Sequence, residues 1–293
     1  MLRRAHQKQI DYLVYLIEKM RYTRDECTVP EIYILSNARN MFNVSILKSL
    51  RAYIPKIAAC DASPQDAWII SVFTSRSKKA IEYLTPHQND IFCIAELGKR
   101  LWIKNITSND IIEAHIQRGV DANYADSLYQ RAAYNKNIRM IQKAAAMLHP
   151  NAIYYLASID QHNENHELAI QRYTQAISLG CPQARSTLAE DYLKGTVGIP
   201  QDIPKAVSMY KQMLLDGYNY VYNNIHTAHI RYEDAFVPYG EWCPDPFMHR
   251  FVLKQIHDQI RSVLLMHTRP DSVFSLLPKV LLHVLCFWIC TKG

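Results

Sequence analysis

Apolar side chains recur along this chain every three or four residues, which is the spacing of a helix face. The clearest stripe lies in residues 1–22, on a helix whose other faces hold charged side chains. The apolar positions of this helix are Ile10, Leu13, Val14, Ile17 and Met20. Such a stripe is typical of packing against a protein core, and membrane-surface binding is the alternative. No strand-like alternation occurs in residues 1–119, so the pattern predicts an all-α fold.

Helix starts are marked by capping residues and by prolines in a first turn. Ser63-Pro64 and Thr85-Pro86 both give this signal, and residues 45–59 are predicted as one helix interrupted near Pro55. We therefore expect about five or six helices with short loops in residues 1–119.

The stretch from Pro182 to Gly217 predicts two short helices joined by a glycine-containing loop. The apolar positions of its first helix are four residues apart and share one face, and a glycine in the left-handed conformation ends that helix. The second helix begins at an aspartate cap and carries its own apolar stripe. The residues with a structural role in this unit are Ala184, Leu188, Tyr192, Gly195, Asp202, Ala206, Tyr210 and Gly217.

This unit resembles the Sel1-like repeat, a relative of the tetratricopeptide repeat, at those eight positions and at Gly198 and Lys205. It departs from the family pattern at Ala189, at Ile199 and at Met213-Leu214. The resemblance implies an α-solenoid of helical hairpins that acts as a scaffold in protein complexes. It also implies an effector role, because many such proteins of intracellular bacterial pathogens act inside host cells.

An earlier copy of the unit precedes it, with a shorter loop and with Asp160 where the later copy has Tyr192. Matching residues lie 32 positions apart in the first helix and 37 apart in the second, so the difference is confined to the loop. The pairs are Ala152 with Ala184, Leu156 with Leu188, Ala169 with Ala206 and Tyr173 with Tyr210.

Three regions are predicted: a helical N-terminal domain (1–119), the repeats (120–230) and a C-terminal helical cap (231–293). The apolar stretch Val280–Cys290 would make a helix of about 16 Å, against roughly 30 Å of bilayer core. We therefore expect a buried cap, and membrane association through this tail is the alternative.

Composition narrows the range of functions. Only 8 glycines occur, and no phosphate loop, dinucleotide motif or nucleophile elbow is found, so no cofactor and no catalytic residue is assigned. The pairs His162/His166 and His226/His229 lack a third ligand at metal-site spacing, so no metal site is assigned either. The net charge of +6 is concentrated before Cys60, yet no RNA-binding motif accompanies it, so no nucleic acid is expected.

The 7 scattered cysteines, without a Cys-x-x-Cys pair, indicate a reducing compartment. The expected location is the cytoplasm, or a host cell reached without a cleavable signal.

The leading hypothesis is a non-catalytic adaptor whose concave repeat groove binds another protein or a peptide. The groove residues proposed from the sequence are Tyr155, Arg185, Thr187 and Asp191. Two alternatives stay open. One is an enzyme with its active site in residues 1–119 and the repeats as a targeting module, and the other is a membrane-associated factor held by the tail.

Overall fold

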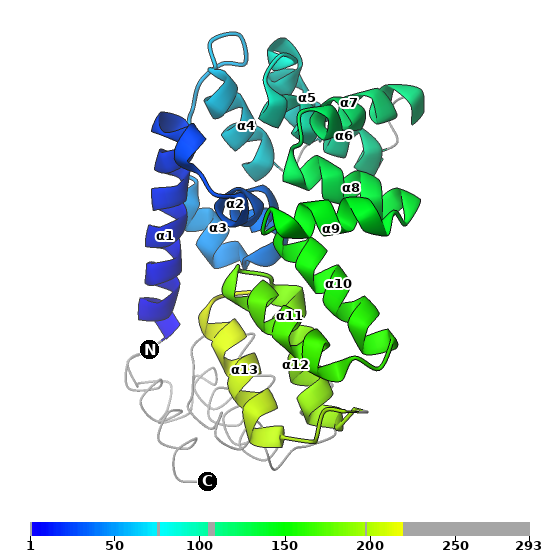
Figure 1. Cartoon of the computed structure of the whole chain (residues 1–293). Helices are drawn as coiled ribbons and strands as arrows, with labels where there is room; N and C mark the ends of the chain where they lie inside the picture. The colour runs from blue at the N-terminus through cyan, green and yellow to red at the C-terminus, as the bar shows by residue number, and fades with distance from the viewer. Residues whose placement is uncertain (1, 75–76, 105–108, 197, 219–293) are drawn as a thin grey trace, which may run out of the picture.

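The computed structural model describes residues 2–74, 77–104, 109–196 and 198–218 (Figure 1). These residues form helices and short turns with no strand, so the predicted all-α fold is confirmed. The helices are α1 (Leu2–Tyr22), α2 (Val29–Met41), α3 (Val44–Leu50), α4 (Pro64–Phe73), α5 (Ser77–Leu84), α6 (Ile91–Lys104), α7 (Asn109–Asp121), α8 (Ala125–Asn135), α9 (Ile138–Ala146), α10 (Pro150–His162), α11 (His166–Ser178), α12 (Pro182–Lys194) and α13 (Ile203–Leu215), with 3-10 turns η1 (Arg24–Glu26) and η2 (Thr85–His87).

Successive helices pack in pairs, and the pairs follow one another around α2 (Figure 1). The pairs are α4/α5, α6/α7, α8/α9, α10/α11 and α12/α13. Pairing therefore begins at α4, inside the predicted N-terminal region. One cluster of buried apolar side chains includes residues from Ile10 to Tyr218, and the predicted boundaries at 119 and 230 stay predictions.

The α12/α13 hairpin contains the repeat motif. Ala184, Leu188 and Tyr192 are buried on α12, and Ala206 and Tyr210 are buried on α13. Gly195 follows α12 with φ of 67°, where its backbone N–H donates to the carbonyl oxygen of Asp191. Asp202 caps α13, because its Oδ1 accepts from the backbone N–H of Lys205 at 3.0 Å. Gly217 follows α13 with φ of 74°.

The position that differs between the two repeats links the helices of a hairpin in both. Asp160 on α10 forms an ion pair with Arg172 on α11. In the next hairpin, Lys205 donates to the Tyr192 hydroxyl at 2.8 Å, and its Nζ lies 4.0 Å from the ring centroid. The sequence difference therefore exchanges one link between paired helices for another.

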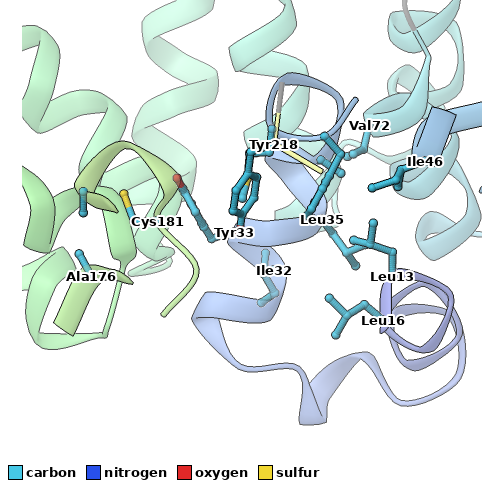
Figure 2. Close-up of a cluster of buried hydrophobic side chains, with 14 of the residues drawn as sticks. Leu13, Leu16, Ile32, Tyr33, Leu35, Ile46, Val72, Ala176, Cys181 and Tyr218 are labelled. Carbon is cyan, nitrogen blue, oxygen red and sulfur yellow. The ribbon is translucent and has the colours of Figure 1, made fainter. Parts of the chain in front are cut away.

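The N-terminal stripe faces the core: Ile10, Leu13, Ile17 and Met20 are buried, as the packing interpretation predicts. Beside α1, helix α2 lies along the inner side of the curved array (Figure 1). Figure 2 shows Tyr33 of α2 pointing toward Cys181, between the N-terminal helices and the repeats.

Two helix predictions were wrong. The helix predicted over 45–59 ends at Leu50, and Ile54 and Ile57 pack on the core from irregular backbone, which the restriction before Pro55 favours. Thr85-Pro86 forms only η2, and the next helix starts at Ile91. Its cap is Asp90, whose Oδ1 accepts from the backbone N–H of Cys93 at 3.1 Å. The predicted C-terminal cap, its tail and His226/His229 lie outside the described residues.

Candidate functional site: the inner face of the repeat array

Each of the last two hairpins begins with a proline in the first turn of its first helix, followed by a carboxamide side chain. Pro150 and Pro182 lie 32 residues apart, and so do Asn151 and Gln183. Proline suits this place because the first-turn N–H has no helical partner. The repeat register therefore places Asn151 and Gln183 at the same level of neighbouring inner helices.

These two side chains meet Tyr33 of α2. The Tyr33 hydroxyl donates to Oδ1 of Asn151 at 2.7 Å, and Oε1 of Gln183 lies 3.5 Å away. The tyrosine is 2% exposed, so its hydroxyl is removed from bulk water and its hydrogen bond matters for stability. The array thus already holds a helix on its inner face.

His149 lies beside this contact and caps α10. Its Nδ1 accepts from the backbone N–H of Ala152 at 3.3 Å, so Nε2 carries the proton and donates to Oδ1 of Asp126 at 3.3 Å. The imidazole stacks on Tyr129 with 4.9 Å between ring centroids and meets Tyr33 edge-on at 5.5 Å. These contacts fix the ring in one orientation.

The space between α2, α8 and α10 is small. Val29, Ile32, Tyr33, Tyr124, Ala125, Asp126 and His149 line a cavity of about 10 Å³. One water molecule needs about that volume, so this cavity has no room for an organic ligand.

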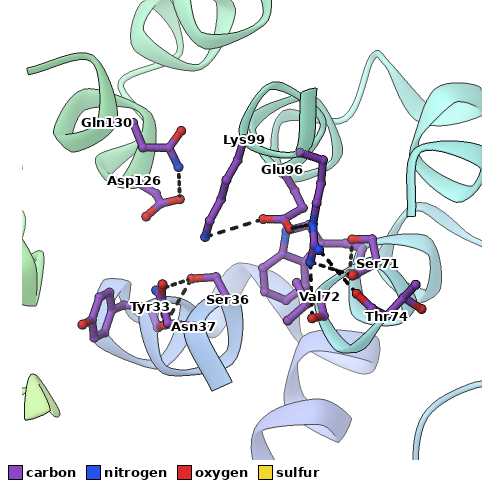
Figure 3. A network of polar contacts seen from close by, with 12 residues as sticks. Tyr33, Ser36, Asn37, Ser71, Val72, Thr74, Glu96, Lys99, Asp126 and Gln130 are labelled. Carbon is purple, nitrogen blue, oxygen red and sulfur yellow. Dashed lines mark hydrogen bonds and ion pairs between the residues drawn. The ribbon is translucent and has the colours of Figure 1, made fainter. Parts of the chain in front are cut away.

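Charged side chains continue from Asp126 toward α4 (Figure 3). Burial alone would raise the pKa of Asp126, but the charge of Lys99 and hydrogen bonds from His149 and Gln130 lower it to about 2. Lys99 also lies 3.8 Å from Glu96, which pairs with Arg100 at 2.7 Å.

The two arginines at the far end of this network satisfy the last carbonyl groups of α4. Arg100 donates to the carbonyl oxygen of Ser71 at 2.8 Å, and Arg39 of α2 donates to that of Thr74 at 2.7 Å. Since the charges are paired with each other or with helix ends, the network acts to fasten α2 to the array.

The groove residues predicted from the sequence lie in contacts between helices. Arg185 forms an ion pair with Asp216 at 2.6 Å, and the Thr187 hydroxyl lies 3.4 Å from that of Tyr154. Tyr155 is partly buried beside a small apolar cluster of α8–α10.

The fourth predicted groove residue, Asp191, is buried on α12. It accepts from Gln161 at 2.9 Å and from Thr196 at 3.3 Å. Burial raises its pKa, although the two hydrogen bonds partly oppose that shift. The structure does not bring the four predicted residues to one open surface.

Sequence reasoning missed Tyr33, Asp126 and His149. A usable signal was present, since the 32-residue register that relates Ala152 to Ala184 also relates Asn151 to Gln183. Their common partner on α2 follows only from the fold.

Other candidate chemistry is limited in the described part of the chain. It contains no group of three or more His, Cys, Asp or Glu residues arranged to hold a metal ion. Burial raises the pKa of Cys27 and of Cys93, and the Cys93 thiol donates to the carbonyl oxygen of Pro64 at 3.2 Å. A raised pKa keeps a thiol protonated and weakens it as a nucleophile. Among the same residues, none of the helices has the length and apolar character needed to cross a bilayer.

No family model matches this sequence, and no curated protein does. Among solved structures, the chain is similar to a Sel1 repeat protein from Oxalobacter formigenes, at 19% identity over 63% of this chain and 88% of that chain, with a TM-score of 0.45. It is also similar to an immunity protein from Pseudomonas aeruginosa, at 18% identity over 76% of this chain and 91% of that chain, with a TM-score of 0.46. One of these neighbours thus carries the repeat that the Pro182–Gly217 motif resembles.

Proposed function

We propose that the protein is a non-catalytic platform that binds another protein on the outer surface of its repeat array. The supporting observation is that the inner face already holds a helix, because α2 contacts α10 and α12 through Tyr33 and α4 through Arg39. The predicted groove residues join helices to one another. A partner therefore needs a different surface.

Helix α9 offers such a surface, which we call the α9 patch: Lys136, Ile138, Arg139, Lys143 and Leu148. Ile138 is 49% exposed and Leu148 45% exposed. The three cations form no ion pair within the described residues, and residues 136–149 contain no Asp or Glu. Exposed apolar side chains near positive charges that have no ion pair suit a partner surface with acidic groups around an apolar side chain.

Affinity capture with full-length protein and matched variants tests this proposal. One bait is wild type, the second carries Ile138→Asp with Arg139→Glu, and the third carries Tyr12→Asp with Lys8→Glu on the exposed side of α1. We expect at least one protein that wild type and the α1 variant enrich equally and that the α9 variant loses by about tenfold or more.

The purified partner should then bind more weakly as salt rises, because the cations of the patch are exposed. Equal loss in both variants, or no protein that distinguishes the baits, would refute the assignment of binding to α9. Circular dichroism of each bait shows whether its helices are intact.

The location proposed from the sequence, a reducing compartment, is supported by the thiols of the described residues. Cys27, Cys60, Cys93 and Cys181 are all free. Free thiols are the usual state in a cytoplasm, whether of the producing cell or of a host cell. Fractionation with thiol labelling before lysis tests this, since protein in an oxidising compartment would show blocked cysteines.

A further inference from the structure

Helix α3 and the segment after it form a basic surface. Between Glu31 and Asp61 the chain carries Arg39, Lys48, Arg51 and Lys56, with no Asp or Glu. Arg39 points inward to α4, whereas the other three side chains are exposed and form no ion pair or hydrogen bond in the part of the chain that the structure describes.

We call this surface the α3 patch: Val44, Lys48, Arg51, Tyr53 and Lys56. Val44 is 61% exposed and Tyr53 47% exposed. Val44, Lys48 and Arg51 are spaced to share the outer face of the helix, while Ile46 and Leu50 are buried on the other side. Like charges three residues apart on a helix repel one another, so a neutralising partner would stabilise this surface.

The described chain ends beside this patch. The backbone N–H of Asn43, which caps α3, donates to the carbonyl oxygen of Gly217 at 2.8 Å. The Tyr218 ring stacks on Phe42 with 5.3 Å between centroids. The chain that follows residue 218 therefore starts at the N-terminal end of α3.

The sequence that follows has the opposite charge. Residues 232–249 contain Glu233, Asp234, Glu241 and Asp245 and no Lys or Arg. The same segment carries five aromatic residues: Tyr232, Phe236, Tyr239, Trp242 and Phe247. The chain between Tyr218 and Tyr232 can span about 45 Å when extended, and α3 is only about 10 Å long, so the segment can reach the patch.

We propose that the acidic segment 232–249 docks on the α3 patch of the same chain, with its carboxylates at Lys48, Arg51 and Lys56 and its aromatic rings against Val44 and Tyr53. Single exposed ion pairs contribute only about 0.2–1 kcal/mol. Attachment to the same chain gives the segment a local concentration in the millimolar range, so several weak contacts suffice. The inference involves no partner protein and stands apart from the α9 patch.

Zero-length carbodiimide cross-linking tests this contact, because it joins a lysine amine to a carboxylate only at ion-pair distance. The sample is full-length protein mixed from ¹⁴N- and ¹⁵N-labelled chains, analysed by mass spectrometry. Lys19 and Glu31, at 2.9 Å, provide the internal positive control. Lys143 is the exposed lysine without an ion pair that serves as the negative control.

We expect links from Lys48 or Lys56 to the acidic residues of 232–249, within chains of one label. Arg51→Glu leaves both lysines in place and should reduce these links about tenfold, whereas Arg139→Glu on α9 should leave them unchanged. A salt concentration of roughly 1 M, where the screening length is near 3 Å, should also reduce them and spare the Lys19–Glu31 link.

Three outcomes would overturn the proposal. The Lys19–Glu31 link could form while Lys48 and Lys56 stay unlinked. Links could join chains of different label, which would make a second copy the occupant. Lys143 could link to the same carboxylates as readily as Lys48, which would make the contact non-specific.

Discussion

The α10/α11 and α12/α13 hairpins bury the same positions but begin and end their first helices differently. Ala152 and Ala184 are both fully buried, and Tyr173 and Tyr210 are each 1% exposed. The cap position holds His149 in one hairpin and Cys181 in the other, 32 residues apart. After its first helix, the α10/α11 hairpin turns through Glu164 at φ of 62°, and the α12/α13 hairpin turns through Gly195 at φ of 67°.

This difference shows which parts of the repeat must stay the same. A buried alanine or tyrosine fits a space that both neighbouring helices define, so few other side chains fill it. A cap or a turn only has to provide hydrogen-bond partners for the backbone groups at a helix end, and several residue types can do this. The repeat pattern is therefore retained in the core and varies at the helix ends.

The largest difference in stability cost between the two hairpins is expected at the cap position of their first helices. His149→Ala removes the acceptor for Ala152 N–H and a partner of Asp126, and we expect the free energy of unfolding to fall by about 2–3 kcal/mol. Cys181→Ala removes a small side chain that makes no capping bond and whose thiol donates only weakly, to Asn151 and Gln183 at 3.5 Å, so it should cost about 1 kcal/mol. Urea denaturation followed by circular dichroism measures both. Equal losses of unfolding free energy would show that the hydrogen bonds of the His149 imidazole add no stability beyond that of an ordinary side chain.

The pH dependence of stability should distinguish Asp126, which is partly buried, from Asp191, which is buried. The pKa of Asp126, about 2, lies below its ordinary value of 3.8, so this carboxylate stabilises the fold above pH 4 and loses that effect as pH falls from 4 toward 2. We expect the stability difference between wild type and Asp126→Asn to shrink by roughly 2 kcal/mol over that interval.

Asp191 provides the opposite case. Burial raises its pKa, so its charge opposes folding at neutral pH, and that penalty disappears as pH falls below the folded pKa. Acidification should therefore raise the free energy of unfolding of the wild type relative to that of Asp191→Asn. Parallel pH profiles for the two variants would contradict the assigned shifts.

The two turns should respond to substitution with opposite signs. Glu164→Gly relieves a left-handed conformation and should stabilise the protein by about 1 kcal/mol. Gly195→Ala should destabilise it by about 1–2 kcal/mol, because φ is positive and the new Cβ would lie 3.2 Å from the backbone nitrogen of Gln201. Thermal and urea unfolding of the two variants decide this, and a stabilising Gly195→Ala would contradict it.

The smallest difference in stability is expected between the two tyrosines at equivalent repeat positions, Tyr173 and Tyr210. The Tyr173 hydroxyl donates to Oε1 of Gln161 at 2.7 Å, so Tyr173→Phe should cost about 1 kcal/mol. The Tyr210 hydroxyl has no hydrogen bond within the described residues, so Tyr210→Phe should change stability by less than about 0.5 kcal/mol. A larger loss at Tyr210 than at Tyr173 would reverse this interpretation.

Local patterns in the sequence predicted much of the fold. The stripe from Ile10 to Met20, the Ser63 cap and the Pro182–Gly217 hairpin all depend on residues close together in the chain. The end of α3 at Leu50 and the cap at Asp90 were missed, because competing start and stop signals of similar strength lie within a few residues.

The inner face could not be predicted in the same way. Tyr33 and Asn151 are 118 positions apart, and helical periodicity does not say which buried face meets which helix. The structure buries one side of α2, but nothing in the sequence indicates that this helix occupies the place where a partner was expected. For that reason the predicted groove residues and the residues that actually line the inner face differ.

The placement of α2 also affects how the protein is made. Helix α2 leaves the ribosome before α10 and α12 exist, yet the Tyr33 hydroxyl donates to Asn151 of α10 and lies 3.5 Å from Oε1 of Gln183 on α12. Contacts between residues far apart in the chain slow folding, and exposed apolar surface in the meantime favours aggregation. A simple stack of hairpins can fold from any point and fray from its ends, since each unit touches only its neighbours. Here α2 completes its contacts only after α10 and α12 have been synthesised, so this part of the array should gain its final structure in one late cooperative step.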